Sequence, residues 1–111
     1  MELNVERQGG TLIAKAAGRI DGVNASDFEQ SLSGAIDDSD TAVIVDLADL
    51  SYISSAGLRA VLLTAKALSR RSAKFALCSP SKPIREVFEI SGFDKIIDIH
   101  DSRDAALSSV G

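Results

Sequence analysis

The chain has 111 residues, of which 45% are hydrophobic and 25% charged, and its formal net charge is −4. This length and composition fit one packed domain over residues 1–111 and exclude a disordered chain. The basic residues are dispersed, which argues against a nucleic-acid-binding protein, because such proteins usually carry a basic stripe.

The first two predicted elements form a hairpin. Apolar and polar residues alternate over residues 3–7 and again over residues 11–17, and Gly9 and Gly10 separate the two runs. Two alternating runs joined by a Gly-Gly turn are typical of antiparallel strands. Residues 18–22 continue or end the second strand.

A helix and a buried strand follow. Asn24 is a suitable N-cap, and the apolar residues after it share one helical face as far as Ile36. The acidic cluster at residues 37–40 ends this helix, and we expect it to form a solvated turn. Residues 41–47 are a nearly continuous apolar run, which is typical of a strand buried on both faces. We expect a loop over residues 48–54.

The rest of the chain predicts three helices and two short strands. The second helix begins at Ser55, and residues 74–78 form a short strand after it. Pro83 suits the first position of a third helix, and Gly92 suits its left-handed C-terminal cap. The isoleucines within residues 96–99 predict a last strand, and a closing helix follows.

The order of predicted elements is therefore β-β-α-β-α-β-α-β-α. Strands that alternate with helices imply right-handed crossovers and a largely parallel sheet. The N-terminal hairpin makes the sheet mixed. We therefore expect a single α/β domain with a mixed, mostly parallel sheet and four helices.

The cysteine content and the apolar runs indicate the compartment. Cys78 is the only cysteine, so it cannot form an internal disulfide, and we expect a buried thiol in a reducing environment. No segment is typical of a signal peptide, and no apolar run approaches the roughly 20 residues of a membrane span. We therefore expect a cytoplasmic protein that is not inserted into a membrane.

The residues offer little for catalysis. His100 is the only histidine, and we expect it to be an exposed loop residue beyond the last strand. A serine hydrolase would need a histidine as its base, and the segment around Ser55 lacks the two-glycine nucleophile elbow. No phosphate-binding loop and no calcium-loop spacing is present. We expect a non-enzymatic protein with no catalytic residues, no metal and no cofactor.

The most informative segment is residues 43–58, where a buried strand is followed by two serines at the start of a helix. Serine at such a position is usually an N-cap. The whole segment resembles the STAS family, whose name joins sulfate transporters and anti-sigma factor antagonists. The resemblance covers nearly the entire chain, and it also includes residues 18–21, 87–99 and 104–107.

The resemblance implies roles for particular residues. The phosphorylated serine of the family falls on Ser55, which precedes Ala56 and Gly57. The family often has an acidic residue before that serine, whereas this chain has Ser54, which leaves open whether Ser54 is a second acceptor. Asp21 matches an acid that family members keep near the phosphorylation site. The partner-binding set implied by the resemblance is Asp21, Ser54, Ser55, Ala56, Gly57 and Leu58.

The resemblance also implies partners. Family members of this size act as anti-anti-sigma factors, which bind a serine-kinase anti-sigma factor while they are unphosphorylated and are released when that kinase phosphorylates them. A PP2C-type phosphatase resets the cycle.

The fold should tolerate a phosphate at a helix N-terminus, where it meets free N–H groups and the positive end of the dipole. Asp21, Asp46 or Asp49 would add like-charge repulsion if they lie nearby.

Two other functions stay open. STAS domains also occur in anion transporters and lipid-transport assemblies, so this chain could be a stand-alone adaptor subunit of a membrane transport assembly. The second alternative is nucleotide or small-ligand binding by the domain itself. Co-purification with an ATP-binding transporter subunit would favour the first, and thermal stabilisation by GTP or ATP would favour the second.

Overall fold

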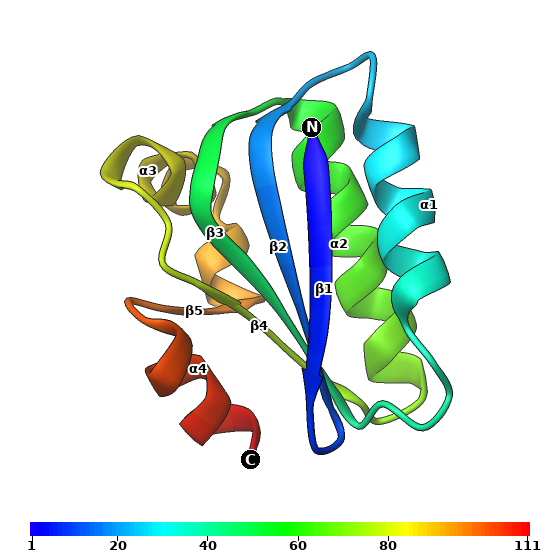
Figure 1. Cartoon of the computed structure of the whole chain (residues 1–111). Coiled ribbons are helices and arrows are strands. Elements are labelled where there is room, and N and C mark those ends of the chain that lie inside the picture. Colours follow the sequence, from blue (N-terminus) through cyan, green and yellow to red (C-terminus); the bar gives the residue numbers. More distant parts are fainter.

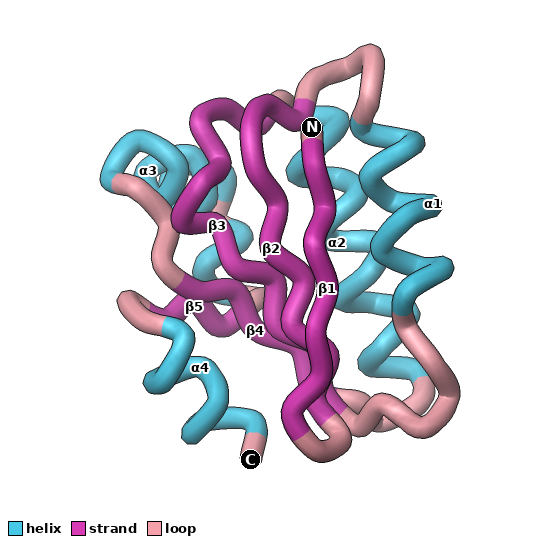
Figure 2. The backbone as a smooth tube through the Cα atoms, in the orientation of Figure 1, coloured by secondary structure: helices cyan, strands magenta, loops and turns pink.

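A five-stranded sheet in the order β1-β2-β3-β4-β5 organises the protein (Figures 1 and 2). The computed structural model describes residues 1–111. Its elements are β1 (Glu2–Gln8), β2 (Thr11–Ile20), α1 (Ala25–Ala35), β3 (Ala42–Ile53), α2 (Ser55–Arg70), β4 (Lys74–Cys78), α3 (Lys82–Ser91), the 3₁₀ turn η1 (Phe93–Lys95), β5 (Asp98–His100) and α4 (Arg103–Val110). This is the predicted order of strands and helices, with η1 added before β5.

The sheet is mixed in the way the sequence predicts. β1 and β2 pair antiparallel across a tight turn in which Gly9 has φ +60°. This left-handed conformation is one that glycine adopts without steric cost. The remaining neighbours, β2 with β3, β3 with β4 and β4 with β5, all pair in parallel. The carboxyl ends of β2 and β3 therefore lie at the same edge of the sheet.

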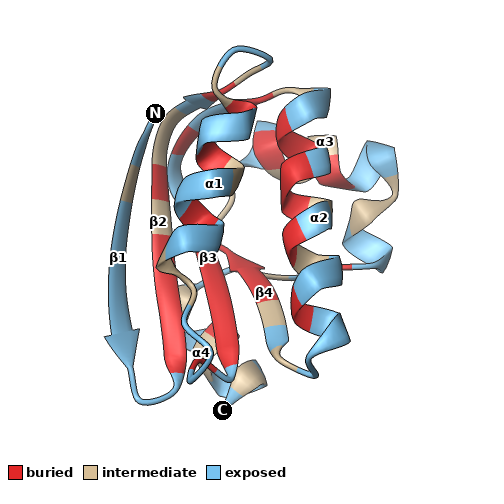
Figure 3. Ribbon diagram, turned by 90° about the vertical axis from the view of Figure 1, so that its right-hand side faces the viewer, coloured by how far each residue is buried: buried red, intermediate tan, exposed pale blue.

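Helices cover both faces of the sheet, and each face has its own core. The larger core lies between the sheet and α1, α2 and α3, with Phe28, Leu32, Val61 and Phe88 among its buried residues. In Figure 3 the buried stripes of α1 and α2 face the central strands, whereas β1 is largely exposed. The smaller core lies under α4 on the other face and includes Cys78, which is fully buried as expected.

The strand β3 is longer than predicted, since it continues through residues 48–53 rather than ending at residue 47. A register shift between Lys15 and Ala17 of β2 interrupts its pairing with β3. The shift leaves Leu47 and Leu50 both in the core, three residues apart. This spacing breaks the two-residue alternation of a regular strand, which is why the prediction of a loop was wrong.

The acidic cluster at residues 37–40 is not simply a solvated turn. The side chain of Asp40 is only 2% exposed and pairs with Arg7 of β1, with an Nε–Oδ1 distance of 2.9 Å. Arg71, at the end of α2, donates hydrogen bonds to the carbonyl oxygens of Asp37 and Asp40. The cluster therefore ties α1, β1 and α2 together at the amino ends of the parallel strands.

Three smaller predictions need correction. Pro83 is the second residue of α3 rather than the first, although Gly92 has the expected left-handed conformation with φ +79°. The last strand is confined to Asp98–His100, and Ile96 precedes it as a 66% exposed residue. His100 is half-buried within that strand instead of exposed beyond it, and its Nε2 atom is buried without a hydrogen-bond partner.

Candidate functional site

The two predicted functional segments meet at the carboxyl ends of β2 and β3. Ile20 and Ile53 are partners in the parallel ladder, and the backbone N–H of Ser54 donates to the carbonyl oxygen of Ile20 at 2.9 Å. The β2–α1 loop, which carries Asp21, therefore begins directly beside the residues that open α2. In open α/β sheets such strand ends are where functional groups collect.

The two serines at the start of α2 have different environments. Ser54 is the N-cap, and its Oγ accepts a hydrogen bond from the N–H of Gly57 at 3.2 Å. Ser55 is the first residue of the helix and is exposed. Because Ser54 makes the cap hydrogen bond, the Ser55 hydroxyl is not needed to satisfy the first turn of the helix.

The small residues after Ser55 lie on different sides of the helix. Ala56 is exposed, whereas Gly57 is buried and Leu58 is only 8% exposed. A Cβ atom at residue 57 would lie 2.7 Å from Cγ1 of Ile53 and 2.8 Å from Cγ2 of Ile20. The glycine thus allows the first turn of α2 to pack directly against the ends of β2 and β3. Of the predicted partner-binding residues, Gly57 and Leu58 are therefore buried, whereas Ser55 and Ala56 are exposed.

A network of hydrogen bonds fixes the loop that carries Asp21. The Oδ1 atom of Asp21 accepts from the N–H groups of Val23, at 2.9 Å, and of Asn24, at 3.2 Å. Asn24 accepts the N–H of Asp21 and donates its amide to the carbonyl oxygen of Arg19, each at 2.9 Å. Asn24 is the N-cap residue of α1, but its side chain makes no cap hydrogen bond to that helix. This network was not predicted from the sequence, although the Asp21-x-x-Asn24 spacing is a signal from which it could have been found.

Asp46 and Asp49, which could also repel a phosphate on Ser55, are both paired with cations. Asp46 is buried and accepts from the guanidinium of Arg103 on α4, at 2.9 Å. Its hydrogen bonds, and to a smaller degree those of Glu6, raise the pKa of Arg103 above its ordinary value. Asp49 pairs with Lys15 at 3.1 Å. Of the three carboxylates, Asp21 is the one on the loop beside Ser54.

The imidazole of the chain is not placed to activate Ser55. His100 lies on β5, which β4 separates from β3, and α2 follows β3 directly. Cys78, the ladder partner of His100, is fully buried, and this burial raises the pKa of its thiol. No group of three or more histidine, cysteine, aspartate or glutamate residues is arranged to hold a metal ion.

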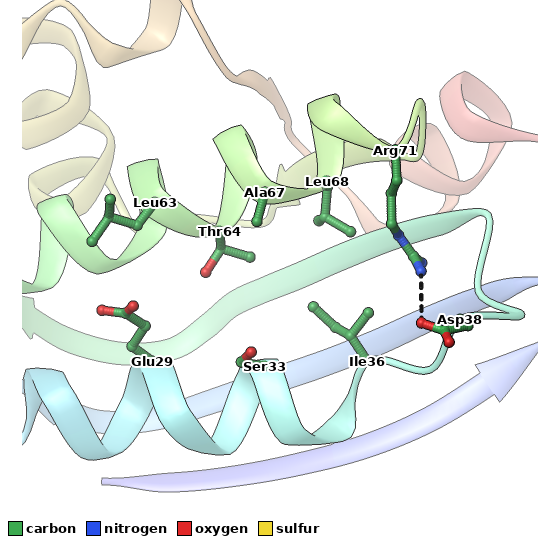
Figure 4. Close-up of a pocket in the computed structure, with 9 residues that line it drawn as sticks. All are labelled: Glu29, Ser33, Ile36, Asp38, Leu63, Thr64, Ala67, Leu68 and Arg71. Carbon is green, nitrogen blue, oxygen red and sulfur yellow. Dashed lines mark ion pairs between the residues drawn. The ribbon is translucent and has the colours of Figure 1, made fainter.

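A groove of about 180 Å³ runs between α1 and α2, away from the predicted site (Figure 4). Glu29 and Leu63 lie toward one end of it, and the ion pair between Arg71 and Asp38, at 3.7 Å, lies at the other. Its volume is below the roughly 300–1,000 Å³ of typical small-molecule sites. None of the predicted site residues lines this groove.

Comparison with known proteins identifies the family. Residues 2–106 match the model of the STAS domain. The chain belongs to the STAS domain family. This confirms the resemblance that the sequence indicated around Ser55.

Individual STAS proteins resemble the chain over nearly its whole length. A protein of Bordetella bronchiseptica named as an anti-sigma factor antagonist, BtrV, is 42% identical over 98% of this chain and 94% of its own. The crystal structure of an anti-sigma factor antagonist from Mycobacterium paratuberculosis superposes with a TM-score of 0.90 at 27% identity, covering 98% of this chain and 92% of that one. SpoIIAA, an anti-sigma factor antagonist solved in its unphosphorylated form, has the same fold with a TM-score of 0.81 at 23% identity, over 98% and 96% of the two chains.

The sequence predicts a protein that is not inserted into a membrane, and the helices of the structure bear on this expectation. None of them combines the length and the apolar character that crossing a bilayer would require.

Proposed function

We propose that this STAS protein is an anti-sigma factor antagonist that works by partner switching. In this scheme it binds a serine-kinase anti-sigma factor while Ser55 carries a free hydroxyl, and it is released after Ser55 is phosphorylated. The observation that carries the proposal is the exposed position of Ser55 at the start of α2. The name of the Bordetella bronchiseptica relative, at 42% identity over 98% of the chain, supports the antagonist role.

The chemistry of the cycle belongs to the partners. The kinase transfers the γ-phosphoryl group of ATP to Oγ of Ser55, the hydroxyl loses its proton, and ADP leaves. A PP2C-type phosphatase then hydrolyses the ester with water and regenerates serine and inorganic phosphate. The STAS protein is the substrate of both reactions and not an enzyme, and the cycle takes place in the cytoplasm.

The arrangement of the two serines favours Ser55 as the acceptor. Ser54 is half-buried and its hydroxyl oxygen caps the first turn of α2, so modifying it would disturb the N–H of Gly57. Ser55 can be modified without loss of that cap. A phosphate at the first helical position also meets the positive end of the helix dipole, so α2 should stay folded. Consistent with this, the SpoIIAA fold has been solved in the phosphorylated form as well.

Phosphorylation would act on the binding surface directly. It adds about −1.5 to −2 charges and three acceptor oxygens to an exposed position. An interface that had fitted the small hydroxyl would then have to desolvate a dianion beside the Asp21 loop. Each ~1.4 kcal/mol lost in this way lowers the affinity tenfold. A phosphate that finds no cation in the interface would therefore be enough to release the partner.

The test is to map the acceptor. Purified protein is incubated with ATP and each serine-kinase anti-sigma factor of the same cell, and the products are analysed by intact-mass and peptide mass spectrometry. We expect one phosphate on the wild type and on Ser54→Ala, and none on Ser55→Ala. Phosphate on Ser54, or incorporation into Ser55→Ala, would refute the assignment.

A further inference from the structure

The exposed face of α2 is basic, although the protein as a whole is acidic. The helix contains Arg59, Lys66 and Arg70 and no acidic residue. All three basic residues are exposed. The ion pairs of the structure involve other cations, namely Arg7, Lys15, Arg71, Arg85 and Arg103. The three cations of α2 are therefore free to bind an anion.

Arg59 is the cation of this face that is nearest to Ser55 along the helix. The two residues are four positions apart, which places their Cβ atoms about 5–6 Å from each other on the same side. An anion at the first position and a cation four residues later is the more favourable order for such a pair, and the anion also meets the positive end of the helix dipole. In the unmodified protein the hydroxyl of Ser55 gives Arg59 no charge to pair with.

Arg19, the other exposed arginine at this end of the sheet, is already engaged. Its guanidinium lies 4.3 Å from the centre of the Tyr52 ring. The neighbouring residues Ile20 and Ile53 face α2. Since side chains alternate along a strand, Arg19 and Tyr52 lie on the opposite face of the sheet. That leaves Arg59 as the guanidinium available to a group on Ser55.

We propose that Arg59 is the intramolecular partner of phosphorylated Ser55. This inference rests on the proposed function, since it concerns the same modification. The guanidinium donates charge-assisted hydrogen bonds to the phosphate oxygens. The modification then changes the surface in two ways. It adds a dianion at residue 55, and it pairs Arg59, so that this cation of the exposed face of α2 is no longer free.

The test does not depend on a kinase. Phosphoserine is incorporated at residue 55 during synthesis of the full chain, and the ³¹P chemical shift is titrated at 0.15 M salt in the wild type, Arg59→Gln, Arg59→Lys and Lys66→Gln. The second pKa of a phosphoserine lies ordinarily near 6. Pairing with Arg59 lowers this pKa, so we expect the Arg59→Gln titration to move up by about 0.2–0.4 pH units, with Arg59→Lys in between.

Lys66→Gln is the matched control, because it removes one exposed cation of the same face. Lys66 is eleven residues from Ser55, about 16 Å along the helix, which is beyond the roughly 8 Å Debye length at this salt. We expect its titration to match the wild type. Equal titrations of wild type and Arg59→Gln, or equal shifts in Arg59→Gln and Lys66→Gln, would overturn the inference. A failure of the kinase to modify Ser55 would instead count against the proposed function alone.

Discussion

Replacing Gly57 with alanine tests how the structure positions Ser55. The new methyl group would lie 2.7 Å from Cγ1 of Ile53 and 2.8 Å from Cγ2 of Ile20. Both atoms are attached directly to the branched Cβ of a core residue, so neither can swing away as the end of a long side chain could. The first turn of α2 must therefore move away from the sheet, and Ser55 would move with it.

The expected loss of stability combines two opposing terms. Forcing a methyl group into a packed contact costs about 1–3 kcal/mol. Removing a glycine from a helix returns about 0.5–1 kcal/mol. We expect a net destabilisation of about 1–2 kcal/mol, which lowers the melting temperature by roughly 4–10 °C for a domain of this size.

The assay is urea and thermal unfolding followed by circular dichroism, with Gly34→Ala of α1 as the control. Apart from its chain neighbours and the backbone of its own helix, no atom lies within 4 Å of a Cβ atom built at residue 34, so this substitution should be neutral or stabilising by up to about 1 kcal/mol. If Gly57→Ala were as stable as Gly34→Ala, the close packing of α2 on Ile20 and Ile53 would be wrong.

Three further predictions concern buried polar groups. Arg103→Gln leaves the carboxylate of Asp46, which is 6% exposed, without its cation, so we expect a loss of about 2–4 kcal/mol in urea unfolding. The hydrogen bond from Arg7 holds the pKa of Asp40 below its ordinary value of 3.8, so the free energy of unfolding falls as the pH drops below 3.8. We expect this fall to be shallower in Arg7→Gln, as measured by unfolding between pH 5 and about pH 2. The fully buried thiol of Cys78 should react with a thiol reagent only after unfolding in urea.

Each of these predictions has a result that would contradict it. Arg85 pairs with the exposed Asp101, so Arg85→Gln should cost less than about 1 kcal/mol, and an equal effect of Arg85→Gln and Arg103→Gln would argue against a buried pair. Parallel pH profiles of wild type and Arg7→Gln would mean that Asp40 does not contribute. Labelling of the native thiol at the rate of a free peptide would place Cys78 at the surface.

Sequence patterns predicted the elements whose residues repeat regularly. The apolar residues that share one face as far as Ile36 identified α1, and the apolar run of residues 41–47 identified the central strand. The second half of β3 could not be found in this way, because the register shift against β2 and the exposed residues Ser51 and Tyr52 remove the alternation. Asp40 could not be recognised as buried, since its partner Arg7 lies 33 residues earlier.

The candidate site was predictable only in part. The resemblance to STAS proteins pointed to Ser55, and its exposure agrees with that role. Only the structure shows that Ser54 caps the helix while Ser55 stays exposed, because two adjacent serines before a helix are equivalent in sequence. The same holds for Gly57, whose packing against Ile20 and Ile53 depends on how two strands and a helix meet.

The most direct test of the account is the affinity of this STAS protein for its anti-sigma factor with and without a phosphate on Ser55. Isothermal titration calorimetry compares the unmodified chain, the chain with phosphoserine at residue 55, and Ser55→Ala. We expect the unmodified chain and Ser55→Ala to bind alike and the phosphorylated chain to bind at least tenfold more weakly, a loss of ~1.4 kcal/mol or more. Equal affinities of the phosphorylated and unmodified chains would contradict the switch.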